Sequence, residues 1–299
     1  GRSHAAGTLV LLRDDNRRLS GFDTLVSNAA ARHGRTATPM LSGMVEQGQD
    51  FGSDAVRVVE APTVAVLAGP EVSSLNLGEV WHFFERQLGY PVTLLPTDGL
   101  RRADLDRYDV IILPEGRYGS LLGESGRERL EAWVRDGGRL VLMGEAIRSF
   151  DEVEAFGLAY QPDDSTAEAR MPLEDRLRTY ADRNRDEAPD RIRGAVLRTQ
   201  LDGTHPLAFG YDGDYYTLKR DTLAFTYLKD GWNVGVLRAS APLSGFTGLR
   251  ARAKARRALV FGEQPLGRGE VVYLVDNPIF RGFWKQGHLL FANAIFMRR

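Results

Sequence analysis

The sequence contains no cysteine at any of its 299 positions. This absence excludes disulfide bonds, cysteine-ligated zinc or iron–sulfur sites and thiol nucleophiles. Long hydrophobic runs are also missing, since no apolar run approaches the ~18 residues that a membrane span requires, and we expect no membrane insertion. Positive charge is not in excess, because 39 Lys and Arg stand against 40 Asp and Glu. A global basic field for nucleic acid is therefore excluded, and we expect no nucleic-acid partner.

Short, nearly continuous apolar runs are the strongest structural signal that is present. Runs of this length between Gly, Pro and Asp residues are typical of strands buried on both faces of a parallel sheet. They span 64–67, 110–113, 140–143 and 271–275, with a fifth candidate at 92–95. Amphipathic helices are predicted over 77–88, with Asn76 as N-cap, and over 125–136. The alternation predicts an α/β fold with a doubly wound, mostly parallel sheet.

Three regions follow from this pattern. They are an N-terminal lead-in or flap over 1–61, an α/β core over 62–161 and 258–299, and a charged insertion plus a smaller β-containing addition over 162–257. Composition and turn residues predict further elements. These are strands over 8–12, 196–201 and 222–228, a hairpin joining 258–261 to 271–275, and helices over 22–33 and 288–297.

One pair of residues, His82 and Glu85, has the His-x-x-Glu spacing of zinc carboxypeptidase ligands, and His205 could serve as a distant third ligand. A catalytic zinc site needs three convergent ligands and an open position. His82 and Glu85 lie off the apolar stripe of the predicted helix, however, and no pattern places His205 opposite them. We therefore expect a surface histidine, and no metal site in this chain.

Polar residues follow three of the predicted strands. They are Glu115, Gly116 and Tyr118 after 110–113, Glu145 after 140–143, and Asp276 and Asn277 after 271–275. Loops at the carboxyl ends of parallel strands line the crevice in which α/β folds bind ligands. The sequence therefore predicts a polar, acidic crevice, although Glu115-Gly116 and Asn277-Pro278 also suit simple turns.

The turn after strand 140–143 is where class I glutamine amidotransferase-like folds carry their nucleophile. The sequence offers only Gly144 and Glu145 there. A carboxylate can act as a nucleophile or base, but acyl transfer also needs a paired histidine and an oxyanion hole, and no pattern marks either. We expect no catalytic residue in this chain, and a hydrolase that uses Glu145 or Glu115 is the alternative.

Five of the eight residues over 250–257 are basic. Such a cluster could attract nucleic acid or lipid head groups. Single-strand binders interleave aromatic side chains with their basic residues, and this cluster has none. A solvated helix face is the favoured interpretation.

Several phrases of the sequence, taken in order, resemble one family. They are 43–53, PTVAVLAG at 62–69, GEVWHFFE at 78–85, YPVT at 90–93, THPLAFGY at 204–211 and DNPIFRGFW at 276–284. Together they cover about residues 7–297. The set resembles the C-terminal region of large bacterial zinc carboxypeptidase-like proteins, where a class I glutamine amidotransferase-like domain follows a carboxypeptidase A-like catalytic domain.

The resemblance implies a flavodoxin-like, three-layer fold and a non-catalytic accessory role. It implies an upstream metallopeptidase domain of the same polypeptide as partner, with the zinc held there and no cofactor here. It also implies a periplasmic or secreted parent protein. Without cysteine, the amidotransferase triad does not carry over. A peptide- or glycan-binding module with its crevice at Glu115, Tyr118 and Asn277 stays an alternative, and homo-oligomerisation is left open.

Overall fold

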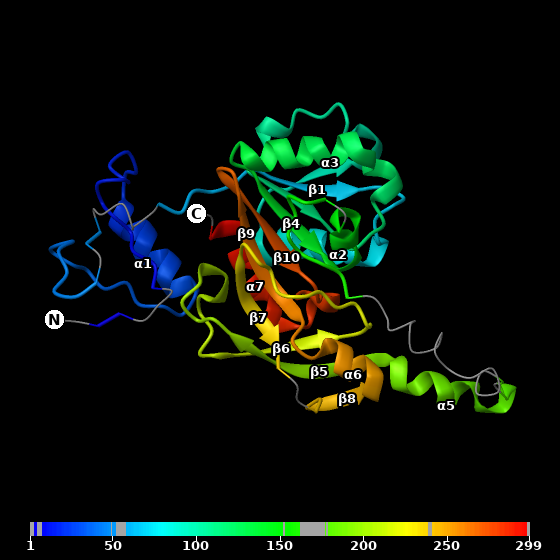
Figure 1. Ribbon diagram of the computed structural model, residues 1–299. Helices are drawn as coiled ribbons and strands as arrows, with labels where there is room; N and C mark the ends of the chain where they lie inside the picture. Colours follow the sequence, from blue (N-terminus) through cyan, green and yellow to red (C-terminus); the bar gives the residue numbers. More distant parts are fainter. Residues whose placement is uncertain are drawn as a thin grey trace. The chain divides into compact units, whose positions relative to one another are not determined.

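The computed structural model describes residues 3–4, 8–48, 50–51, 58–151, 153–161, 177, 179–238 and 241–297. Contacts divide the chain into two units, Gly1–Val58 and Val59–Arg299 (Figure 1). No helix among the described residues has the length and apolarity that a membrane span requires.

The first unit contains helix α1 (Phe22–Arg32), which confirms the helix predicted over 22–33. None of the residues of α1 is buried. The strand predicted over 8–12 is wrong, because these residues form no ladder. A strand needs a partner for its backbone groups, and no strand occurs in the described part of this unit.

One continuous sheet organises the second unit. Its order within the described residues is β2-β1-β3-β4-β10-β9-β7-β5-β6, and β8 pairs with β5. The strands are β1 Val64–Ala68, β2 Thr93–Pro96, β3 Val110–Leu113, β4 Arg139–Met143, β5 Ile192–Leu201, β6 Asp214–Lys219, β7 Trp232–Leu237, β8 Ser244–Thr247, β9 Leu259–Leu266 and β10 Gly269–Leu274. Strands β2, β1, β3, β4 and β10 are parallel. Their order is that of flavodoxin-like folds, 2-1-3-4-5.

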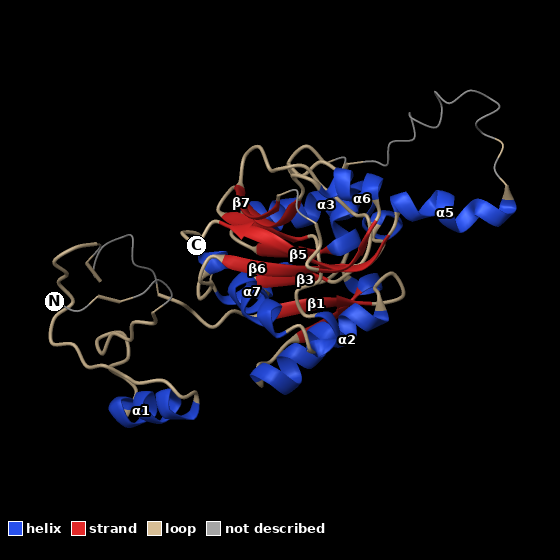
Figure 2. Cartoon of the chain, turned by 90° about the horizontal axis from the view of Figure 1, so that it is seen from below, coloured by secondary structure: helices blue, strands red, loops and turns tan. Residues whose placement is uncertain are grey.

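Helices cover both faces of the parallel strands (Figure 2). They are α3 Gly119–Arg135 on one face, and α2 Ser74–His82 with the π-helical continuation η1 Phe83–Leu88 and α7 Lys285–Phe296 on the other. The insertion adds α5 Arg183–Glu187 and α6 Leu249–Ala255. Successive residues of β1, β3, β4 and β10 alternate between two cores, as the two-residue period of a strand requires, whereas the edge strand β2 buries only Leu95, and Leu94 and Thr93 stay exposed. Leu67 and Ile111 pack in one core with Leu130 of α3, and Val66 and Val110 pack in the other with residues of α2, η1 and α7. The result is a three-layer α/β unit.

Most elements predicted from the sequence are present in this unit. The five apolar runs form β1, β2, β3, β4 and β10, and the hairpin is confirmed as β9 and β10. Helix α3 begins at Gly119, earlier than expected, and its backbone breaks at Gly123, where φ is 54° and ψ is −165°. Strands β5 to β8 of the insertion extend the core sheet beyond β9. Residues 162–176 and 178 of the charged insertion lie outside the described residues.

Two local predictions are wrong. The helix expected from Asn76 starts earlier, because the side chain of Ser73 caps it by accepting from the Asn76 backbone N at 3.4 Å. The strand expected over 222–228 is an irregular segment that makes a single bridge, Tyr160 to Phe225. Its backbone groups bind a mixture of partners, such as Thr226 N to Ala159 O at 2.9 Å and Leu228 N to the side-chain Asn233 Oδ1 at 2.8 Å. Composition alone cannot show which partner a backbone group will find.

A buried arginine joins the last part of the chain to the sheet. Arg139, at the start of β4, donates from Nε to Glu270 Oε1 at 2.7 Å and from Nη2 to Glu263 Oε2 at 3.1 Å. It also donates to the backbone oxygens of Ala294 and Met297, both at 2.8 Å, at the end of α7. These carbonyls have no partner within a helix. One guanidinium therefore ties β4, β9, β10 and α7 together.

Candidate functional site

The loops after β1 and β3 meet where the strand order reverses, the point at which α/β sheets bind ligands. Here they are bonded directly to each other, since Ser73 N donates to Glu115 O at 2.7 Å and Arg117 N to Glu71 O at 3.0 Å. A Cβ on Gly116 would lie only 2.6 Å from Glu71 O, so this approach requires glycine. These backbone bonds leave no open space between the two loops that follow β1 and β3 at the points where they meet.

Glu115 follows β3 and turns its side chain toward the end of β4. At that end Gly144 has a φ of +53°, and a Cβ there would lie 2.7 Å from Glu115 Cγ. The Glu115 carboxylate also lies 3.4 Å from Arg220 Nη2. The side chain of Glu115 therefore occupies the space that a side chain at position 144 would need.

The environment of Glu115 raises the pKa of its carboxyl group above the ordinary range. Burial is the main cause, and the Arg220 charge opposes it. Further carboxylates add to the rise, and they are Asp221, Glu79 and Asp276. The protonated form of Glu115 is thus favoured relative to a glutamate in water.

A second carboxylate, Glu79 of α2, joins this helix to the segment after β10. It accepts from Asn76 Nδ2 at 3.0 Å, from Asn277 Nδ2 at 2.6 Å and from Arg281 N at 2.7 Å. Asn76 in turn accepts from the backbone N of Glu115 at 2.8 Å. The predicted residues Glu115 and Asn277 are therefore linked through two residues that the sequence did not mark as site residues.

The predicted residue Asp276 belongs to a buried ion pair. Its Oδ1 accepts from Lys219 Nζ at 2.9 Å, and its Oδ2 from Thr217 Oγ1 at 2.8 Å. Lys219 Nζ also donates to Leu223 O at 2.7 Å. Burial lowers the pKa of Lys219, but the Asp276 and Asp221 charges outweigh it, so the pKa lies above the usual value. Asp276 serves mainly to balance this lysine.

Tyr118 and Glu145 behave differently from the prediction of one shared crevice. Tyr118 is fully buried in the core, and its hydroxyl donates to Pro114 O at 2.9 Å. Burial raises the pKa of this phenol well above its ordinary value, with a smaller contribution from Glu71. The Glu145 side chain is 48% exposed and has Arg148 at 3.9 Å. The prediction that Tyr118 lines the crevice is wrong, because its ring packs in the core.

The three residues with zinc-ligand spacing lie in different surroundings. His82 and Glu85 are exposed, and His82 Nδ1 is 3.4 Å from Gln87 Nε2. His205 is buried, accepts from Leu207 N at 3.2 Å, and lies 3.6 Å from Glu263. Within the described part of the chain, no three His, Asp or Glu side chains are grouped so that they could hold a metal ion.

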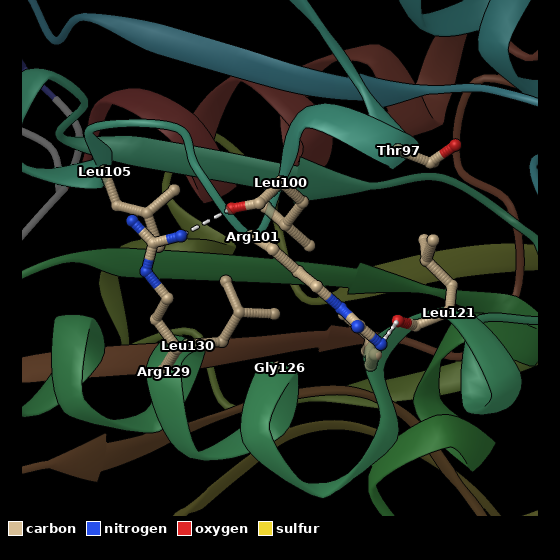
Figure 3. A pocket seen from close by; sticks show the side chains of 9 residues that line it. Thr97, Leu100, Arg101, Leu105, Leu121, Gly126, Arg129 and Leu130 are labelled. Carbon is tan, nitrogen blue, oxygen red and sulfur yellow. Dashed lines mark hydrogen bonds between the residues drawn. The ribbon is translucent and has the colours of Figure 1, made fainter.

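A small pocket lies away from these loops, between the segment after β2 and helix α3 (Figure 3). Its lining residues are Thr97, Leu100, Arg101, Leu105, Leu121, Leu122, Gly126, Arg129 and Leu130. Both arginines bind backbone, Arg129 Nη1 to Leu100 O at 2.6 Å and Arg101 Nη2 to Leu121 O at 3.3 Å. Thr97 donates to Glu71 at 2.7 Å. The pocket therefore offers mostly leucine and is not a candidate for chemistry.

Solved structures resemble this chain in fold only. PurLQS from Thermotoga maritima matches with a TM-score of 0.53 at 12% identity, covering 79% of this chain and 98% of that one. A ThuA-like protein from Parabacteroides merdae matches with a TM-score of 0.51 at 12% identity, covering 78% and 88%. No family model matches the sequence, and no curated protein matches it.

The fold is class I glutamine amidotransferase-like. The sheet order and the three layers agree with this assignment. In the amidotransferase-like fold the turn after β4 is the nucleophile elbow. The elbow position has the positive φ of such a turn, but Gly144 carries no side chain, and Glu115 fills the space beside it.

Proposed function

We propose that this chain is a non-catalytic accessory domain of a bacterial zinc carboxypeptidase-like protein that is periplasmic or secreted. The single observation that carries the non-catalytic part is the filled elbow, where Glu115 Cγ would lie 2.7 Å from any Cβ at position 144. The parent protein is inferred from the ordered phrases of the sequence, among them 62–69 and 276–284. Zinc belongs, in this proposal, to the upstream domain.

The backbone of the loop after β3 supports the same conclusion. Acyl transfer needs free backbone N–H groups that point at the developing oxyanion. Here Glu115 N donates to Asn76 Oδ1, Arg117 N to Glu71 O, and Tyr118 N to Ser149 Oγ. Three donors of this loop are therefore committed to internal bonds, and the loop is organised as structure.

The catalytic alternative is tested by hydrolysis assays on glutamine, simple esters and peptides with free C-termini. We expect no turnover above buffer, because Gly144 supplies no nucleophilic side chain at the elbow and the three N–H donors of the loop after β3 are engaged in internal bonds. Glu115→Gln and Glu145→Gln are the decisive variants. Turnover that either variant abolishes would establish the hydrolase that uses that residue. Turnover that both variants retain and that co-purifies with the chain would place a catalytic group elsewhere in it, and either result would overturn the proposal.

The proposed parent is tested separately, by reading the genomic sequence upstream of the codon for Gly1. We expect an open reading frame in phase that encodes a metallopeptidase domain with its own His-x-x-Glu pair and distant histidine. An in-frame stop codon directly upstream would remove the parent protein from the proposal. The non-catalytic assignment would stand, because it depends on the elbow.

A binding module is the second candidate, and one observation favours it. Arg220 lies over the ring of Phe280 at 4.4 Å and beside Glu115 at 3.4 Å, and both charged side chains are partly exposed. Paired charge next to an aromatic face suits polar ligands such as peptides or glycans. Thermal-shift screening of short peptides and oligosaccharides tests this, since a ligand of the folded state raises the apparent stability. An Arg220→Ala variant should lose any such shift.

A further inference from the structure

One continuous stretch of the chain has no acidic residue. Between Asp230 and Glu263 lie 32 residues without Asp or Glu. Since 40 of the 299 residues are acidic, a stretch of this length would carry about four. The same stretch holds six basic residues, which are Arg238, Arg250, Arg252, Lys254, Arg256 and Arg257. It is a local region of strong positive charge in a chain with a net charge of −1.

Exposed apolar side chains lie in the middle of this stretch. Strand β8 pairs with β5 and is followed directly by helix α6, so that the two elements are neighbours beside β5 (Figure 1). Leu243 is 63% exposed, Phe246 50% and Leu249 67%. Three large apolar side chains within seven consecutive residues thus face solvent.

The basic residues of α6 and its end fall into two groups. Arg250 binds Asp190 through two hydrogen bonds, of 2.6 and 2.5 Å, and Lys254 lies over the ring of Tyr160 at 4.9 Å. The charged groups of these two residues therefore contact other side chains of the protein. Three further arginines are exposed, and no acidic side chain of the described residues pairs with them. They are Arg252, Arg256 and Arg257.

The backbone holds this segment firmly against the rest of the unit. A Cβ on Gly248, between β8 and α6, would lie 2.2 Å from Ala188 O. Gly248 N also donates to Arg191 O at 2.8 Å. Together with the Arg250–Asp190 pair, these contacts fix the segment before any partner binds. Little ordering entropy would be lost on binding.

We propose that Leu243, Phe246, Leu249, Arg252, Arg256 and Arg257 form a surface that docks on an anionic phospholipid bilayer. We call it the β8–α6 surface. Apolar side chains beside arginines suit the membrane interface, where the former enter the acyl boundary and the latter bind lipid phosphates. Charge complementarity selects the occupant, because a chain of net charge −1 is attracted to an anionic surface only through a local basic region. The proposal does not depend on the accessory role.

Nucleic acid is the less favoured occupant for a physical reason. Leucine side chains gain nothing by facing phosphates and sugars, whereas they gain free energy when they leave water for the acyl boundary. Single-strand binding also needs aromatic side chains on which bases can stack, and Phe246 is the only aromatic of the β8–α6 surface. Docking on a bilayer surface requires no membrane-spanning helix.

The test is co-sedimentation of the full chain with vesicles of phosphatidylcholine, with and without phosphatidylglycerol, at low and high salt. We expect binding only when phosphatidylglycerol is present, and loss of binding at high salt because ions screen the charges. The triple variant Arg252→Glu, Arg256→Glu, Arg257→Glu should bind at least about tenfold more weakly. Phe246→Ser should weaken binding severalfold while the net charge is unchanged.

Matched control variants show whether vesicle binding depends on the β8–α6 surface or only on the net charge and on any exposed aromatic ring. The triple variant Arg86→Glu, Arg102→Glu, Arg107→Glu changes three other exposed arginines by the same total charge. Phe283→Ser removes another exposed aromatic ring. Phe283→Ser should bind vesicles within about twofold of the wild type. The control triple variant should bind at least as strongly as the β8–α6 triple variant of the same net charge, and clearly more strongly if the surface determines binding. Circular dichroism checks that every variant is folded.

Three results would overturn the proposal. They are equal binding to vesicles without phosphatidylglycerol, binding that the β8–α6 triple variant retains, and an effect of Phe246→Ser no larger than that of Phe283→Ser. Binding of a DNA duplex or of polyglutamate that the β8–α6 triple variant abolishes, without vesicle binding, would assign the surface to a polyanion instead. That outcome would also overturn the proposal that this surface docks on a bilayer.

Discussion

Gly144 and Glu115 share one small volume at the end of β4, and this contact determines what the elbow can carry. The left-handed φ of +53° already disfavours any residue with a Cβ. A Cβ would also meet Glu115 Cγ at 2.7 Å. The backbone strain and the steric overlap with Glu115 arise from different atoms, so substitutions can measure them separately.

We expect Gly144→Ala to lower the free energy of unfolding by about 2–4 kcal/mol, the sum of backbone strain and overpacking. Adding Glu115→Ala should restore the overpacking part and leave about 1–2 kcal/mol of strain. Urea denaturation of the two single variants and the double variant measures both terms. Additive losses in the double variant would contradict the shared volume.

The raised pKa of Glu115 gives the stability of the protein a pH dependence of known sign. A carboxyl whose pKa is higher in the folded than in the unfolded state binds more protons when folded. The free energy of unfolding therefore falls as pH rises from the ordinary glutamate pKa through the raised value. Burial is the cause, and it outweighs the attraction of Arg220.

Glu115→Gln removes this titration. We expect the stability of this variant, relative to the wild type, to increase between about pH 4 and about pH 7. Urea denaturation at both pH values gives the difference. A relative stability that is constant or falls with pH would show that burial does not dominate at Glu115.

The α2 helix shows how an element differs from its sequence pattern. The apolar spacing predicted the helix but only part of its buried face, because Trp81 is 47% exposed whereas Phe83, beyond the expected stripe, is buried. Gly89 ends the continuation η1 with a left-handed φ of 61°. The start was wrong, because Ser73 and not Asn76 provides the cap. Asn76 is buried and serves the loops instead, bonding Glu79 and Glu115. Local spacing cannot tell a capping pair from a pair that binds distant loops.

The contribution of the Ser73 N-cap to the free energy of unfolding can be measured. We expect Ser73→Ala to lower the free energy of unfolding by about 1 kcal/mol, because the Asn76 backbone N loses its acceptor. Ser74→Ala, one residue later and exposed, should change it by less than about 0.5 kcal/mol. Equal effects of the two substitutions, measured by thermal unfolding, would argue against Ser73 as the cap.

The parallel strands and the elbow could be predicted from the sequence because their signals are local. A run buried on both faces is nearly continuous in apolar residues, and β1 and β3 have this form throughout, as do β4 after Arg139 and β10 after Glu270. The polar partners could not be predicted in the same way. Glu79 meets Asn277 across 198 positions, and Lys219 meets Asp276 across 57. Such pairs depend on the finished topology, which no local pattern contains.

At the scale of the whole molecule, Arg139 connects the sheet to the end of the C-terminal helix through buried hydrogen bonds. It is fully buried, and it pairs with Glu263 and Glu270. Removing it would leave two buried carboxylates without their counter-charge. This loss is costly because the desolvation of each carboxylate stays unbalanced.

We expect Arg139→Met to lower the free energy of unfolding by about 3–5 kcal/mol. Arg135→Met, on the exposed side of α3, should change it by less than about 1 kcal/mol. Urea denaturation followed by tryptophan fluorescence measures both. If the two variants are equally stable, the buried guanidinium contributes no more than a surface ion pair.

The position of β10 between β4 and β9 has a consequence for biosynthesis. When β4 leaves the ribosome, its free edge has no neighbour until β10 is made, and 125 residues separate Met143 from Gly269. At 5–20 residues per second this interval lasts roughly 6–25 seconds. A mostly apolar strand with one open edge is prone to aggregation during that time. The nascent chain is therefore expected to need a chaperone, or slow release, until its last strands and α7 have emerged.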